Sequence, residues 1–166
     1  MNRVVRIERA GEWDSAKAAD RIVLDADDRR RRRIVLTAEK NTTFLLDLAR
    51  PITLRDGDGL VLNAGGIVQV VGKPEPLLEV RASAPGELVR FAWHLGNRHT
   101  DVQIVGDALR IRYDHVLEDM LCGLGAKVTR IEAPFDPEAG AHTHGHSAGP
   151  ERDPDHAHDH RHQSHE

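Results

Sequence analysis

The chain has 166 residues, 39% of them hydrophobic and 30% charged, which fits one domain or two small ones and excludes a large multidomain protein. Its 23 Lys and Arg against 27 Asp and Glu give a net charge of -4, which disfavours nucleic-acid binding as the main function. The single cysteine, Cys122, excludes an internal disulfide and a CxxC site. No apolar run is long enough for a signal peptide or a membrane span, so we expect a soluble cytoplasmic protein without membrane contact.

Short segments rich in β-branched residues dominate the first part of the chain. The segments expected to form strands are 4–7, 21–24, 34–37, 43–48, 60–62 and 67–71. The intervening sequences Asp-Gly-Asp-Gly (56–59) and Asn-Ala-Gly-Gly (63–66) favour positive φ and predict antiparallel hairpins. Residues 1–73 are therefore expected to form an all-β domain.

The most basic stretch of the chain is the run of five arginines at 29–33, which follows closely on three aspartates. Such a mixture of opposite charges predicts a solvated, salt-bridged turn between two strands. A docking site for an acidic partner is the alternative interpretation.

The pattern changes after Lys73-Pro74-Glu75-Pro76, where the prolines predict an extended connection between two domains. A strand at 77–81 is then followed by a helix, with apolar residues at i, i+3, i+4 and i+7. Pro85 lies near the expected start of this helix and Gly96 just past its end.

The rest of this domain is expected to consist of three more strands and a second helix. A hairpin is expected from 102–105 and 109–113, a second helix after the N-cap Asp114, and a final strand at 127–131. The order strand, helix, strand, strand, helix, strand predicts a ferredoxin-like βαββαβ domain over residues 74–141. The fold class is therefore α+β, with two domains and a C-terminal tail.

Histidine is concentrated in that tail, residues 142–166. The tail histidines are His142, His144, His146, His156, His158, His160, His162 and His165. The tail contains no Val, Ile, Leu, Met, Phe, Tyr or Trp, so we expect it to be disordered. Neutral imidazole suits nickel, copper, zinc and cobalt, so these residues predict metal binding without selecting the metal.

Two histidines within the folded part are weaker candidates. His99 follows the first helix, where a histidine taken alone is more often a charge partner of the helix end than a ligand. His115 opens the second helix, whose dipole disfavours a protonated imidazole, so it is a candidate ligand. Cys122 falls beside the apolar stripe of that helix and is interpreted as a buried structural thiol rather than a ligand.

Nothing in the chain predicts catalysis. There is no phosphate-binding or dinucleotide-binding motif, no GxSxG and no HExxH, so we expect a protein that is not an enzyme. An RNA-binding sheet would expose aromatic residues on its central strands, but Tyr113 is the only aromatic there, which argues against that class.

Several segments together resemble the UreE family of urease accessory proteins, which are nickel metallochaperones. The segments are Leu-Arg-Asp-Gly-Asp (54–58), Pro-Leu-Leu-Glu-Val (76–80), His-Leu-Gly-Asn-Arg-His (94–99), Tyr-Asp-His-Val-Leu-Glu-Asp-Met-Leu (113–121), Pro-Phe-Asp-Pro-Glu-Ala-Gly-Ala (134–141) and the histidine-rich end. The resemblance covers nearly the whole chain. It implies an N-terminal domain similar to peptide-binding domains and a C-terminal metal-binding domain through which two chains form a homodimer.

The resemblance also implies roles for particular residues. His99 would be the principal Ni²⁺ ligand, contributed once by each chain of the dimer, and His142, His144 or His146 would complete its coordination shell. His115 would belong to a weaker site. Asp101 stands where many relatives have proline.

The function implied is delivery of Ni²⁺ to apo-urease through the urease accessory GTPase, and Zn²⁺ or Cu²⁺ can be expected to bind in vitro. A cytosolic nickel or zinc buffer, without a dedicated partner, is the alternative.

Overall fold

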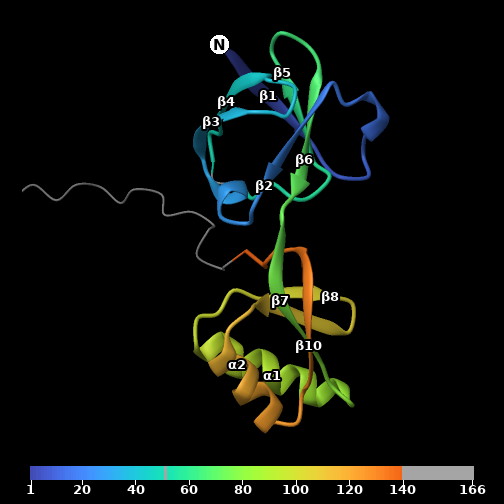
Figure 1. Cartoon of the computed structure of the whole chain (residues 1–166), viewed down its shortest axis with the longest axis vertical. Helices are drawn as coiled ribbons and strands as arrows, with labels where there is room; N and C mark the ends of the chain where they lie inside the picture. Colours follow the sequence, from blue (N-terminus) through green and yellow to red (C-terminus); the bar gives the residue numbers. More distant parts are fainter. Residues whose placement is uncertain (51, 140–166) are drawn as a thin grey trace, which may run out of the picture.

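Ten strands form two sheets, one on each side of Lys73, in a computed structural model that describes residues 1–50 and 52–139 (Figure 1). The elements of the first part are β1 (Asn2–Glu8), η1 (Ser15–Lys17), β2 (Asp20–Leu24), η2 (Asp28–Arg30), β3 (Arg33–Thr37), β4 (Thr43–Asp47), β5 (Gly59–Leu62) and β6 (Ile67–Gly72). All six strands expected here are present. They form one barrel-like sheet in the order β2-β6-β5-β1-β4-β3.

The expectation of antiparallel hairpins throughout this domain is wrong. The turn at 63–66 does join the antiparallel pair β5 and β6, but β1 pairs with β4 and β2 with β6 in parallel. The turn at 56–59 leads into β5 instead of joining two paired strands, and its buried Asp58 carboxylate accepts hydrogen bonds from the backbone of Ala10 and Arg55. Local turn residues reveal a change of chain direction, whereas contacts between segments far apart in the chain decide which strands pair.

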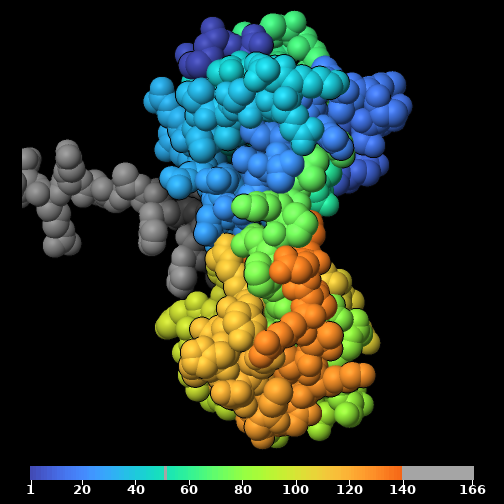
Figure 2. Space-filling model, in the orientation of Figure 1, coloured from blue at the N-terminus to red at the C-terminus, as the bar shows by residue number. Residues whose placement is uncertain are grey.

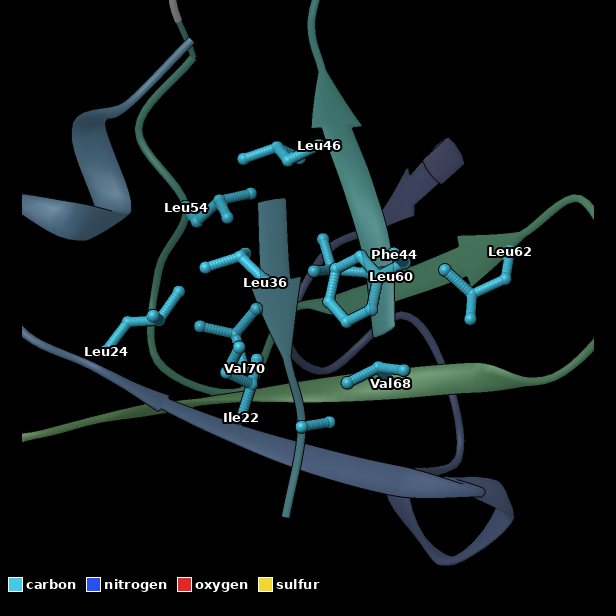
Figure 3. Close-up of a cluster of buried hydrophobic side chains, with 11 residues drawn as sticks. Ile22, Leu24, Leu36, Phe44, Leu46, Leu54, Leu60, Leu62, Val68 and Val70 are labelled. Carbon is cyan, nitrogen blue, oxygen red and sulfur yellow. The ribbon is translucent and has the colours of Figure 1, made fainter. Parts of the chain in front are cut away.

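The barrel-like sheet encloses an aliphatic core around one aromatic ring, that of Phe44 (Figure 3). Alternate residues of the strands supply it, because successive side chains of a strand point to opposite faces. The burial pattern of β2 shows this alternation directly, with Ile22 and Leu24 buried and Arg21 and Val23 exposed.

The second part has the ferredoxin-like arrangement that the sequence predicts. Its elements are β7 (Pro74–Arg81), α1 (Pro85–Asn97), β8 (Gln103–Val105), β9 (Ala108–Arg112), α2 (His115–Gly123) and β10 (Lys127–Pro134). The sheet order is β10-β7-β9-β8 with every neighbouring pair antiparallel, and both helices cover one face of it (Figure 1). The helices contribute Phe91, Leu95 and Leu121 to the core beneath them.

Two details differ from the expectation. Pro74 and Pro76 belong to β7 and not to a separate connection. The strand tolerates them because its pairing with β9 begins only at Leu77, so their missing amide hydrogens break no bond to β9. Gly96 lies inside α1, which continues to Asn97.

The arginine run is not the fully solvated turn that its charge pattern predicts. Arg29, in η2, is 0% exposed and reaches across to the second domain. Its guanidinium donates to the carbonyl oxygens of Leu54 at 3.3 Å and Phe135 at 2.6 Å, and it pairs with the Asp136 carboxylate. The last two partners lie more than 100 residues away along the chain, beyond the reach of any local pattern.

Further contacts surround this buried ion at the junction of the two domains, where the molecule narrows to a waist (Figure 2). Ala26, Leu77 and Phe135 form a small apolar cluster from both domains. Arg112 of β9 donates to Asp27 at 2.8 Å and to Glu75 at 3.2 Å. The junction is thus held by charge pairs around a small apolar centre.

In the part of the chain that the structure describes, no helix is long and apolar enough to cross a membrane.

Replacing Arg29 by Met should destabilise the protein by about 3 kcal/mol, because it removes a buried cation from the carboxylate and the two carbonyl oxygens that surround it. Urea unfolding measures the change. The matched control is Arg31→Ala. The exposed Arg31 side chain pairs with Asp28 at 3.6 Å, its one ion pair among the described residues, and its loss should cost less than about 0.5 kcal/mol. Equal effects of the two substitutions would contradict this assignment.

Candidate metal centre

The C-terminus of α1 presents His99 through a defined backbone motif. The amide of His99 donates to the carbonyl of Gly96 at 3.1 Å, and that of Thr100 donates to Leu95 at 3.3 Å. His99 itself has a φ of 54°, in the left-handed region. This pair of bonds around a left-handed residue is the Schellman motif that ends many helices, with His99 in the place where glycine is the usual residue.

The second helix ends with the same motif and with the usual residue. Gly125, with a φ of 89°, donates its amide to Cys122 at 3.0 Å, and Ala126 donates to Leu121 at 3.0 Å. A left-handed conformation costs a residue with a Cβ roughly 1–2 kcal/mol, which glycine avoids. The chain therefore accepts a strained histidine at one helix end where it uses glycine at the other. Strain held at one exposed residue is a pointer to function.

The segment that leads into the tail lies beside the loop that carries His99. The Glu138 amide donates to the carbonyl of Val102 at 2.8 Å, and the Asp136 amide donates to the side-chain oxygen of Gln103 at 3.1 Å. Val102 is three residues from His99. The last described residues before the tail are thus bound next to the candidate ligand.

The topology of the sheet explains this meeting. Since all neighbouring strands are antiparallel, the starts of β7 and β8 and the ends of β9 and β10 lie at one end of the sheet. His99 precedes β8, His115 follows β9, and the tail follows β10. The first domain precedes β7, so this end of the sheet also faces the junction (Figure 1).

His115 is the exposed first residue of α2, after an N-cap in which Asp114 accepts from the amide of Leu117 at 2.9 Å. Glu118, three residues further along the helix, is already bound to an arginine. Arg130 donates to both of its oxygens, at 2.9 and 2.7 Å, and this hydrogen bonding lowers the pKa of Glu118, with a smaller contribution from the charge of His115. The Glu118 carboxylate is therefore occupied by Arg130.

The other sequence-based candidates have different outcomes. Cys122 is exposed, so its interpretation as a buried thiol is wrong; it lies near the end of α2, beside the buried Leu121. The eight tail histidines lie outside the described residues. Within 1–50 and 52–139, no three His, Cys, Asp or Glu side chains are grouped closely enough to hold a metal ion.

An exposed apolar surface lies on the same helix as the His99 loop. Val89 and Trp93 are 70% and 64% exposed and, four residues apart, share one face of α1. The Trp93 indole also contacts the His94 ring edge-on, with centroids 5.0 Å apart. The apolar pattern of α1 identified its buried stripe but gave no reason to single out this second face.

Asp101, two residues after His99, is the functional candidate that local reasoning leaves without a role. Its carboxylate pairs with Arg30 of η2 at 3.1 Å and lies 4.0 Å from Arg112. The only signal in the sequence is an acidic residue close to a candidate ligand, and that signal does not reveal an arginine 71 positions away.

Comparison with known proteins identifies both halves of the chain. Residues 3–72 match the family described as UreE urease accessory protein, N-terminal domain, and residues 75–165 match its C-terminal domain. Among proteins named "Urease accessory protein UreE", that of Bradyrhizobium sp. (strain BTAi1) is 54% identical over 151 residues, covering 88% of this chain and 73% of the relative. The Rhodobacter capsulatus protein of the same name is 47% identical over 154 residues, covering 90% and 95%.

The substitution His99→Gly should stabilise the metal-free protein by about 1 kcal/mol, because glycine adopts the left-handed conformation without strain. The matched substitution Gly125→Ala, at the equivalent position of α2, should destabilise it by a similar amount. Urea unfolding of both variants tests the comparison. A loss of stability in the His99→Gly protein would mean that the imidazole holds the loop and that no strain is stored there.

Proposed function

The chain belongs to the UreE family of urease accessory proteins, and from this premise we propose that it is a nickel metallochaperone, which binds Ni²⁺ and delivers it for assembly of the urease active site. The observation that carries the proposal is the exposed His99, kept in a left-handed conformation at a helix end where glycine would be favoured. Its imidazole is a ligand that suits Ni²⁺.

One imidazole is a single donor, so the site needs others. A homodimer would supply a second His99 by symmetry, without any further residue in the fold. The exposed Val89 and Trp93 on α1 support this arrangement, since they offer an apolar surface on the helix that leads to His99. We place the dimer contact there.

The tail histidines would supply the remaining donors. Glu138 is hydrogen-bonded beside Val102, and the four residues from Glu138 to His142 can span at most about 14 Å. That reach supports a shell completed by His142, His144 or His146. The later histidines, from His156 on, would hold further ions or pass them on, and His115 would form a weaker secondary site.

This arrangement favours transfer of the metal over storage. Two imidazoles of the folded domains and several imidazoles of the tail can be replaced one at a time by a partner's ligands, whereas a closed thiolate site would resist such exchange. The partners we propose are the urease accessory GTPase and apo-urease, and the protein itself performs no catalysis. We place this process in the cytoplasm, where an exposed thiol such as Cys122 stays reduced.

Substituting His99 by Ala should abolish the tightest Ni²⁺ site, which we expect to hold about one ion per dimer, because the fixed donors of the site are removed. Calorimetric titration with Ni²⁺ measures the loss, with His115→Ala as the matched control. Binding in both proteins should weaken as the pH is lowered, since protons compete with the metal for imidazole. Tight binding that survives in the His99 variant, or a larger loss in the His115 variant, would refute the assignment.

A chain that ends at Ala141 should lose most of its bound metal equivalents yet keep its fold, since the tail contains none of the apolar residues that build the two cores. Mass spectrometry under native conditions during addition of Ni²⁺ would count the ions on the full and shortened chains. Retention of all equivalents by the shortened chain would show that the tail is not a metal store.

A further inference from the structure

The first domain contacts the two chain segments that flank the proposed metal site. We call residues 25–31, which include η2, the junction loop. Its Arg30 pairs with Asp101, two residues after His99, at 3.1 Å. Its Arg29 binds the carbonyl of Phe135 and the carboxylate of Asp136, at the start of the segment that leads into the tail.

These two contacts act on segments that are already joined to each other. The Asp136 amide is bound to the side chain of Gln103, and the Glu138 amide to the carbonyl of Val102. The loop that carries His99 and the segment before the tail therefore form one hydrogen-bonded unit. The junction loop holds that unit at both sides, through two adjacent arginines.

The Arg30–Asp101 contact is part of a longer series of charge pairs. Arg112, which donates to Asp27 of the junction loop at 2.8 Å, also lies 4.0 Å from Asp101. The side chains of Arg30 and Asp101 are 33% and 44% exposed, so the pair contributes little to global stability. The pair lies two residues from His99, whose backbone is bound at the end of its own helix. This position gives the pair a role other than global stability.

We propose that Arg30 and Arg29 are positioning residues, through which the first domain holds the His99 loop and the segment at Phe135 and Asp136 in the geometry needed to bind the metal. The inference rests on the proposed metal-binding function of His99. It makes the affinity of a site in the second domain depend on a loop of the first. A change in the junction loop would then alter the affinity for the metal although the loop does not contact it.

Arg30 is the better residue to test, because Arg29 also stabilises the fold. The sign of the effect separates positioning from simple electrostatics. A nearby positive charge repels a cation, so removal of the Arg30 charge alone would tighten Ni²⁺ binding. Loss of a positioning contact would weaken it instead.

The experiment is a calorimetric titration of the full-length chain with Ni²⁺ at one fixed pH. We expect Arg30→Ala to weaken the tightest site by about two- to fivefold, the range that an exposed ion pair can supply. The matched control is Arg31→Ala, which removes the same charge one residue further along the chain. Among the described residues the Arg31 side chain pairs with Asp28, so its loss should leave the affinity unchanged or slightly tighter. Urea unfolding verifies that both variants remain folded.

A double-mutant cycle isolates the contact. In an Asp101→Asn background, Arg30→Ala should cause no further loss, because the pair is already broken. An effect that persists in that background, or an Arg30→Ala affinity equal to or tighter than that of the control, would overturn the proposal. His99→Ala is titrated in the same series: if it retains the tight site, the proposed function fails, whereas if it loses the site while Arg30→Ala matches the control, this inference alone fails.

Discussion

A single buried cation organises the junction between the two domains. Removing the Arg29 guanidinium from water is costly unless acceptors surround it, and the acceptors come from two loops of different domains, at Leu54 and at Phe135 and Asp136. These two segments must therefore stay together for Arg29 to remain buried. The remaining junction contacts, from the small apolar cluster around Phe135 to the Arg112 pairs, lie around this constraint.

The same constraint reaches the end of the second domain that carries His99. The antiparallel order of its sheet brings the His99 loop, the start of α2 and the exit of β10 to the end that meets the first domain. Because Asp136 is both a partner of Arg29 and the start of the segment beside Val102, the junction holds that segment against the loop that carries His99. The described part of the chain thus presents the exposed imidazole of His99 at this end of the sheet.

Such a site is suited to a metal that must be passed on. A complete coordination shell within one domain would bind strongly and exchange slowly, whereas donors drawn from separate segments can be replaced stepwise. The contrast between the two helix ends expresses this compromise in one residue. The chain keeps glycine at Gly125 and accepts the left-handed strain at His99, the proposed ligand.

The sequence by itself determined the elements whose signals are local. The strands of the first domain, the two helices with the Asp114 cap, and the ferredoxin-like order follow from periodicity and turn residues. His99 became the candidate ligand only through the resemblance of its segment to the UreE family. Tertiary structure decided which strands pair in parallel, the burial of Arg29 and the pairing of Asp101 with Arg30. These features join residues far apart in the chain, and a buried arginine has the same local pattern as a solvated one, since only its distant partners remove the cost of burying it.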